Sequence, residues 1–189
     1  MEFEKYTDRA KAFIQSAQTL ALKSAHQQLD PLHILKVILE DKERLGLDLI
    51  DAAGGQASLA IESVSSALTN LPKVEGTGAG QVYLAPETAR LFEQAEQLAK
   101  KAGDSFVTVE YLLLALAMAS GTASQKILSD SGVNPQNLNK AINDFRKGRK
   151  ANSSSAEDGY DALKKFAQDL TEDAAEGKID PVIGRDEEI

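Results

Sequence analysis

The chain has 189 residues and a formal net charge of −8, which leaves room for one ordinary domain with appendages. Cysteine is absent, which excludes disulfides and thiolate metal sites and fits a reducing compartment. The charged N-terminus, "MEFEKYTDRA", does not match a signal peptide, and no apolar run is long enough to cross a bilayer. These features predict a soluble, cytoplasmic protein with no membrane partner.

The negative charge is concentrated at the C-terminal end. Residues 157–189 hold eleven acidic and four basic side chains, a net of −7, which leaves the preceding residues at −1. A nucleic-acid surface needs a basic stripe, so this distribution argues against a nucleic-acid partner. The one basic cluster, "RKGRK" at residues 146–150, follows a predicted helix, and we interpret it as cations at the negative end of the helix dipole.

The first half of the chain is repeated in the second. Residues 7–39 align with residues 85–117 without a gap at a shift of 78. Their apolar positions coincide, as in Phe13 with Leu91, Ile14 with Phe92 and Leu35 with Leu113. At the same shift, Gly54 meets Gly132. The sequence therefore predicts a tandem duplication.

Each repeat is expected to form four helices. In the first, Thr7 is a suitable N-cap for a helix whose apolar residues recur every three or four positions. Asp30 and Pro31 are suited to the N-cap and first position of a second helix. Two more are expected over about residues 45–53 and 58–70.

The second repeat follows the same plan. Its helix boundaries are predicted at Pro86, Gly103, Thr108, Gly132 and the sequence "NPQNL". The predicted fold class is thus all-α, an eight-helix domain over residues 1–148 with repeats at about 1–71 and 84–148.

Two polar segments divide the chain. The Gly-rich connection "LPKVEGTGAGQVYL" joins the repeats and is typical of a loop. Residues 149–159 are rich in Ser and small polar residues, which predicts a flexible linker. Beyond it, residues 160–189 include one more amphipathic helix.

Catalytic chemistry is not expected in these residues. The two histidines, His26 and His33, are not in a metal-ligand spacing, and there is no nucleophile motif. The Gly-rich connection lacks the Lys-Ser/Thr ending of a phosphate loop. We predict no catalytic residues and no metal site.

The positions at which the repeats differ indicate a binding surface. At a shift of 78, the polar residues Gln28, His33 and Lys36 are replaced by Phe106, Tyr111 and Leu114. If exposed, these side chains would form an apolar interaction patch. The alternative is that they pack between the repeats, which we favour for Leu114 and leave open for Phe106 and Tyr111.

Four stretches together resemble the N-terminal region of the ClpB-type AAA+ disaggregases, which belong to the Clp ATPases. They are the repeated helix unit and the sequences "LPKVEGTG", "GDSFVTVEYLLLAL" and "DLTEDAAEGKIDPVIGRDEEI". The resemblance implies that residues 160–189 begin an α/β AAA+ module. In the longer protein, Val182 and Ile183 would contact the adenine of ATP, and Gly184 and Arg185 would shape that turn. GxxxxGK[ST] is absent, so these residues alone should not hydrolyse ATP, whereas the full-length protein would use ATP and Mg²⁺.

The resemblance also implies a substrate-handling role in the heat and stress response. Such a domain recognises unfolded or aggregated polypeptide and passes it to the pore of a homohexamer, which cooperates with a DnaK-type chaperone through a module outside this sequence. By the same resemblance, Thr7, Asp104 and Glu110 would contact substrate, beside the patch of Phe106 and Tyr111. The three polar residues also suit structural roles, such as helix capping for Thr7 and a place in the first turn of a helix for Glu110.

A second reading is that the domain docks a specific folded adaptor, as in the related unfoldases that work with a protease. The two readings differ in whether binding follows exposed apolar surface or the identity of one partner. A third, an unrelated helical repeat scaffold, does not account for the closing motif.

Overall fold

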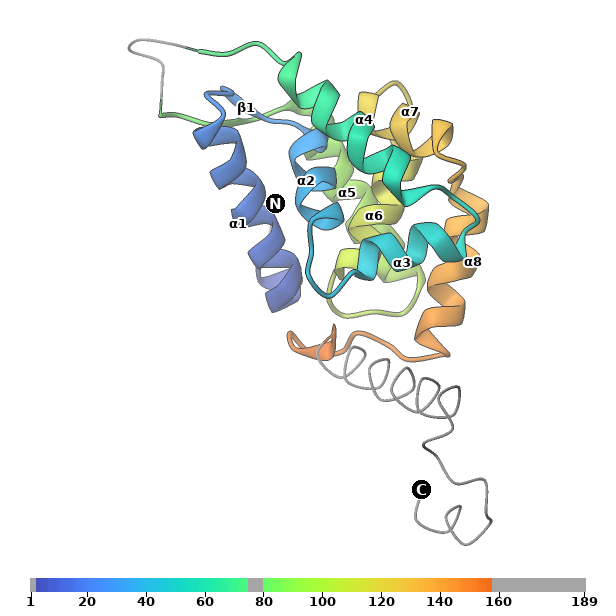
Figure 1. The fold of residues 1–189 in the computed structure, drawn as a ribbon. Coiled ribbons are helices and arrows are strands. Elements are labelled where there is room, and N and C mark those ends of the chain that lie inside the picture. The colour runs from blue at the N-terminus through green and yellow to red at the C-terminus, as the bar shows by residue number, and fades with distance from the viewer. Residues whose placement is uncertain (1–2, 75–79, 158–189) are drawn as a thin grey trace, which may run out of the picture. The chain divides into compact units, whose positions relative to one another are not determined.

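The computed structural model describes residues 3–74 and 80–157 and shows a helical fold (Figure 1). The first repeat comprises a short 3-10 helix Phe3–Lys5, α1 (Asp8–Lys23), β1 (Gln28–Leu29), α2 (Pro31–Leu39), α3 (Leu45–Ala52) and α4 (Ala57–Thr69). The second comprises β2 (Tyr83–Leu84), α5 (Pro86–Lys101), α6 (Val109–Met118), α7 (Ala123–Asp130) and α8 (Pro135–Arg146). Four α-helices in each repeat confirm the predicted fold class for the part of the chain that is described.

The helices begin where the sequence predicts. The Thr7 hydroxyl accepts a hydrogen bond from the Ala10 amide at 3.1 Å, which caps α1. Asp30 caps α2, with Pro31 at the first helical position, and its amide donates to His33 Nδ1 at 2.9 Å. These contacts satisfy amides that have no partner within the helix, so the predicted N-caps are confirmed.

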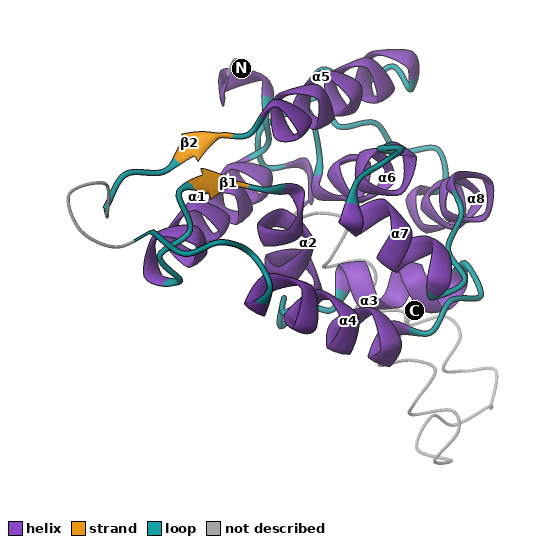
Figure 2. Ribbon diagram, turned by 90° about the horizontal axis from the view of Figure 1, so that it is seen from above, coloured by secondary structure: helices purple, strands orange, loops and turns teal. Residues whose placement is uncertain are grey.

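The two repeats share one core, with α2 and α6 at its centre (Figure 2). Every residue of α6 from Val109 to Ala117 is buried, as are most of those of α2. Contacts between the repeats join α2 with α6, α4 with α7 and α3 with α8. Leu114 is 2% exposed, as the packing alternative predicts, and Tyr111, for which the question was open, is 4% exposed.

Short backbone pairings cross between the repeats in both directions. Strands β1 and β2 pair in parallel, with Leu29 opposite Leu84. A parallel bridge joins Tyr6 to Val107. Because 107 is 29 plus 78 and 84 is 6 plus 78, these two pairings are equivalent under the repeat. Each repeat therefore supplies the residue before its first helix to the other repeat, an exchange that the sequence analysis did not predict.

The compact unit extends to Ala156 rather than ending at residue 148. Residues 149–154, which we call the strap, lie against the domain instead of forming the start of a flexible linker. The Ala151 carbonyl accepts hydrogen bonds from the amides of Ser105 and Phe106, both at 3.0 Å, and Ala151 is fully buried. The prediction was wrong here because hydrogen bonds of the backbone and of polar side chains, rather than apolar side chains, hold this segment.

The remaining predictions at the C-terminal end concern residues outside those described. They are the end of the expected linker, the segment 160–189, and the adenine contacts expected for Val182, Ile183, Gly184 and Arg185. Among the described helices, none is long and apolar enough by itself to cross a membrane, and α6 and α7 reach that length only as a pair bent by 93°.

Candidate functional site

The three polar residues expected to contact substrate are not displayed on the surface. Thr7 is fully buried, and its amide donates to the Val107 carbonyl at 3.0 Å in addition to its capping role. The side chains of Asp104 and Glu110 are also buried, and both bind one guanidinium, that of Arg146. In this conformation each of the three has a structural role.

Arg146, the last residue of α8, lies at the centre of a buried charged cluster. Its Nη1 and Nη2 lie 2.8 Å from the two carboxylate oxygens of Asp104. Its Nε donates to Glu110 Oε2 at 2.8 Å, and Nη2 donates to the Thr108 hydroxyl at 3.1 Å. Helix α6 begins after Thr108 as predicted, but the Thr108 hydroxyl accepts this hydrogen bond from Arg146 and does not cap the helix.

One cation therefore faces two buried carboxylates. Burial alone would lower the pKa of Arg146, but the hydrogen bonds and charges of Asp104 and Glu110 outweigh burial and hold the pKa above its ordinary value. Such a cluster is stable only while all partners are present, since a single removal leaves a buried charge unpaired. Arg146 lies in the last turn of α8, as the interpretation of this basic cluster requires, but its side chain is only 4% exposed and its main partners are the two carboxylates.

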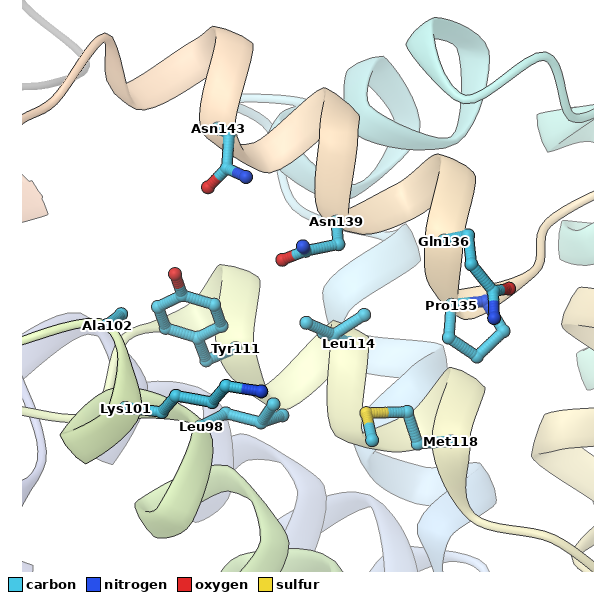
Figure 3. Close-up of a pocket in the computed structure, with 10 residues that line it drawn as sticks. All are labelled: Leu98, Lys101, Ala102, Tyr111, Leu114, Met118, Pro135, Gln136, Asn139 and Asn143. Carbon is cyan, nitrogen blue, oxygen red and sulfur yellow. The ribbon is translucent and has the colours of Figure 1, made fainter.

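A groove opens between α5, α6 and α8 (Figure 3). It has a volume of about 450 Å³. Its apolar side chains are Leu98, Leu114 and Met118, with the Tyr111 ring at one end. Opposite them, α8 presents the side-chain amides of Asn139 and Asn143, which Figure 3 shows turned toward the ring and Leu114. The site thus combines an apolar floor with an uncharged polar wall on α8, and Lys101 of α5 adds a charged side chain to its lining.

The Tyr111 ring links the groove to the charged cluster. Arg146 Cζ lies 4.7 Å from the ring centroid, which is a cation–π geometry. Burial raises the pKa of the Tyr111 phenol, so it stays neutral at ordinary pH. Of the predicted site residues, Tyr111, Asp104 and Glu110 are therefore brought together through Arg146.

Phe106 is not part of this arrangement. It is half-buried and lines a different cavity, of about 550 Å³, beside charged residues that include Lys5, Glu93 and Glu96. The predicted patch of Phe106 and Tyr111 is thus divided between two sites.

The corresponding surface of the first repeat has no such apolar floor. Leu114 and Met118 correspond to Lys36 and Glu40, which form an ion pair at 3.5 Å. Lys36 also donates a hydrogen bond to the Ser65 hydroxyl at 2.8 Å, and Ser65 is the counterpart of Asn143. Charged side chains that bind one another in the first repeat are therefore replaced by apolar ones in the second.

The sequence contained signals for two residues of the site that were not predicted. Met118 replaces Glu40 about one helical turn after Leu114 replaces Lys36, so the apolar substitution continues along one face of α6. Arg146 corresponds to Leu68, a core residue of the first repeat. A charge at a core position indicates a buried ion pair. Asn139 and Asn143 gave no comparable signal.

Among the described residues, no group of three or more His, Asp or Glu side chains could hold an ion. The two histidines bind each other, with His26 Nδ1 and His33 Nε2 separated by 2.8 Å.

Comparison with known proteins places this fold in a family. Residues 5–129 match the model of the Clp repeat (R) N-terminal domain. The chaperone protein ClpB of Rhodopseudomonas palustris is 60% identical over all 189 residues, and that of Rickettsia felis is 46% identical over the same length. The chain spans 22% of the length of each of these relatives.

Solved structures agree in fold. The Hsp104 N-terminal domain from Candida albicans matches with a TM-score of 0.71 at 21% identity, over 80% of this chain and 98% of that one. The N-domain of ClpV from Vibrio cholerae matches with a TM-score of 0.64 at 19% identity, over 80% of this chain and 90% of that one. The family model, the identity to ClpB along the whole chain and the shared fold together show that this chain belongs to the Clp repeat N-terminal domain family.

Proposed function

We propose that this chain is the N-terminal part of an ATP-driven protein disaggregase, and that the groove between α5, α6 and α8 receives unfolded polypeptide. The family relationship to ClpB chaperones supports the general role, and the difference between the repeats supports the location. The observation that carries the location is the replacement of the Lys36–Glu40 ion pair by Leu114 and Met118.

The chemistry of the groove suits an extended chain of variable sequence. Apolar side chains of a substrate would contact Leu98, Leu114 and Met118. The amides of Asn139 and Asn143 can each donate and accept hydrogen bonds, which matches the alternating groups of a peptide backbone. Neither kind of contact selects one sequence strongly, as a protein that handles many unfolded substrates requires.

Among the residues expected from the family resemblance, we assign direct contact to Tyr111, because it lines the groove although it is only 4% exposed. Thr7, Asp104 and Glu110 do not line the groove and would support binding indirectly, through their contacts with the ends of α1, α6 and α8. We leave Phe106, in its separate cavity, as a secondary candidate.

The remaining functions belong to the longer protein. We propose that it is a cytoplasmic homohexamer that binds ATP and Mg²⁺, with Val182, Ile183, Gly184 and Arg185 at the adenine, and that it works with a DnaK-type chaperone. No cofactor is assigned to the domain itself.

The test is an NMR titration of the 189-residue chain with reduced, carboxymethylated α-lactalbumin, a permanently unfolded polypeptide. Chemical-shift changes are expected at Tyr111, Leu114 and Met118. Met118→Glu should weaken binding about tenfold, because it places a charge on the apolar floor. Leu59→Glu is the matched control, since Met118 and Leu59 are both 37% exposed but Leu59 lies on α4, away from the groove.

Equal loss of affinity in the two variants, or shifts that avoid the groove, would overturn the location. If the unfolded polypeptide does not bind at all while one folded protein does, the domain is an adaptor-docking module instead.

A further inference from the structure

The buried charged cluster contacts both the strap and the Tyr111 ring of the groove. Asp104 Oδ1 accepts one hydrogen bond from Arg146 Nη1 at 2.8 Å and another from the Ala151 amide at 3.0 Å. The Ala151 carbonyl is held by the amides of Ser105 and Phe106. Both polar groups of the Ala151 backbone therefore depend on the loop that Arg146 fixes.

The strap continues to the start of the first helix. Lys147 and Gly148 adopt left-handed conformations, with φ of 52° and 85°, and turn the chain back after α8. The Ser154 carbonyl then accepts a hydrogen bond from the Asp8 amide at 2.8 Å. The strap thus connects the end of α8 with the first residue of α1.

The same guanidinium contacts Tyr111 in the groove. The distance of 4.7 Å from Arg146 Cζ to the ring centroid links a groove residue to the cation that holds Asp104. The chain of contacts runs from the Tyr111 ring to Arg146, from Arg146 to Asp104, and from Asp104 to the Ala151 amide. Each step is a direct contact between buried or nearly buried groups.

We propose that Arg146 is a positioning residue that couples the groove to the strap. A ligand that displaces the Tyr111 ring would alter the guanidinium, and with it the carboxylate that binds the strap. By reciprocity, undocking the strap would change the affinity of the groove. Only the identity of the ligand rests on the proposed function, because the coupling is a property of the contacts themselves.

Release of the strap has a mechanical consequence. Six residues that are now bound to the domain would become free chain, with a reach of roughly 20 Å when extended. In the longer protein, this would lengthen the connection between the groove and the residues that follow the strap. A ligand bound in the groove would therefore increase the freedom of movement between the domain and the residues that follow the strap.

Amide hydrogen exchange of the 189-residue chain without ligand tests the coupling. In Tyr111→Leu, exchange of the Ala151, Ser105 and Phe106 amides is expected to be about tenfold faster, because the cation–π contact is lost. Tyr111→Phe should keep the wild-type rates, since the ring remains. Met118→Ala is the groove control, because Met118 lines the same groove about two helical turns along α6 from Tyr111.

The amide of Ile38, at the core of the first repeat, separates coupling from general destabilisation. Local opening of the strap changes its own amides without changing those that exchange only on global unfolding. If the Ala151 rate in Tyr111→Leu equals that of wild type, or rises only in proportion to the Ile38 rate, the coupling is overturned.

In a last experiment, hydrogen exchange of the wild-type chain is measured with reduced, carboxymethylated α-lactalbumin at saturating concentration. A change in the Ala151 exchange rate is expected. If the polypeptide binds and that rate does not change, the coupling is overturned. If it does not bind, the proposed function fails, and the ligand-free comparison still decides the coupling.

Discussion

His26 and Asp104 occupy equivalent positions, 78 residues apart, and each belongs to a buried polar cluster of different chemistry. His26 binds His33, whose counterpart is Tyr111. Asp104 binds Arg146, whose counterpart is Leu68. The duplicated scaffold thus holds a histidine pair in one repeat and a charged cluster beside the groove in the other.

The histidine pair should make stability depend on pH. The Asp30 amide donates a hydrogen bond to His33 Nδ1, so neutral His33 carries its proton on Nε2. This N–H donates a hydrogen bond to His26 Nδ1. Burial, followed by the charge of His26, lowers the pKa of His33 from 6.5 to about 4. Burial and the charge of Lys73 lower the pKa of His26 as well. Both rings are therefore neutral in the folded protein at pH 7.

Between pH 6.5 and pH 4, the unfolded chain binds more protons at His33 than the folded one. The free energy of unfolding should accordingly fall as the pH drops through this window, by roughly 3 kcal/mol from His33 alone. Urea unfolding of wild type and His33→Gln from pH 8 to pH 4 measures the difference. Parallel pH profiles for the two proteins would contradict the prediction.

Removing Arg146 should be strongly destabilising. Arg146→Leu leaves two buried carboxylates without their cation, and the expected loss is about 3–5 kcal/mol. Lys140→Ala on the same helix breaks an exposed ion pair with Asp144 and should cost less than about 1 kcal/mol. Chemical denaturation of both variants tests the contrast.

A double variant extends this test. Glu110 corresponds to Leu32, so Arg146→Leu with Glu110→Leu restores the apolar pair of the first repeat. We expect the double variant to be more stable than Arg146→Leu alone, because one unpaired carboxylate is removed. A double variant that is less stable than the single one would show that Glu110 is not the source of the cost.

Thr7 should act on stability and not on polypeptide affinity. Thr7→Ala removes the cap of α1 and should cost about 1 kcal/mol, whereas Thr7→Ser keeps the hydroxyl and should cost less. Binding of unfolded polypeptide to the folded fraction should be the same in both. If Thr7→Ala weakens binding and the stability is unchanged, direct substrate contact is the better account.

Tyr6 should stabilise the junction of the repeats through its hydroxyl. It donates to Glu96 at 2.7 Å, and burial, then this bond, raises the pKa of the phenol. Tyr6→Phe keeps the edge-on contact with Phe92 and should cost about 1–2 kcal/mol. Glu96→Gln, which retains an acceptor, should cost less in the same denaturation experiment.

Local chemistry explains what the sequence could predict. The starts of α1 and α2 depend on Thr7, Asp30 and Pro31, whose effects reach only a few residues along the chain. The exchange of polar for apolar residues on α6 was also visible, because the repeat provides an internal comparison.

The partners of Arg146 could not be predicted in the same way. Asp104 and Glu110 are 42 and 36 residues away in the sequence, and their meeting depends on how α8 packs on α6. The strap is held by hydrogen bonds of its backbone and of polar side chains such as Lys150, so its composition resembled that of a linker. The groove exists only once α5, α6 and α8 are assembled.

The two repeats pair reciprocally, through Leu29 with Leu84 and through Tyr6 with Val107. This arrangement resembles the isologous interface of a symmetric homodimer, with both halves in one chain. A single repeat expressed alone would lack the segment that completes its own pairing. Two copies could supply it to each other, so an isolated repeat should assemble as a homodimer with exchanged segments. Within one chain the two halves need not be identical, and here one half carries an ion pair where the other carries the apolar side chains of the groove.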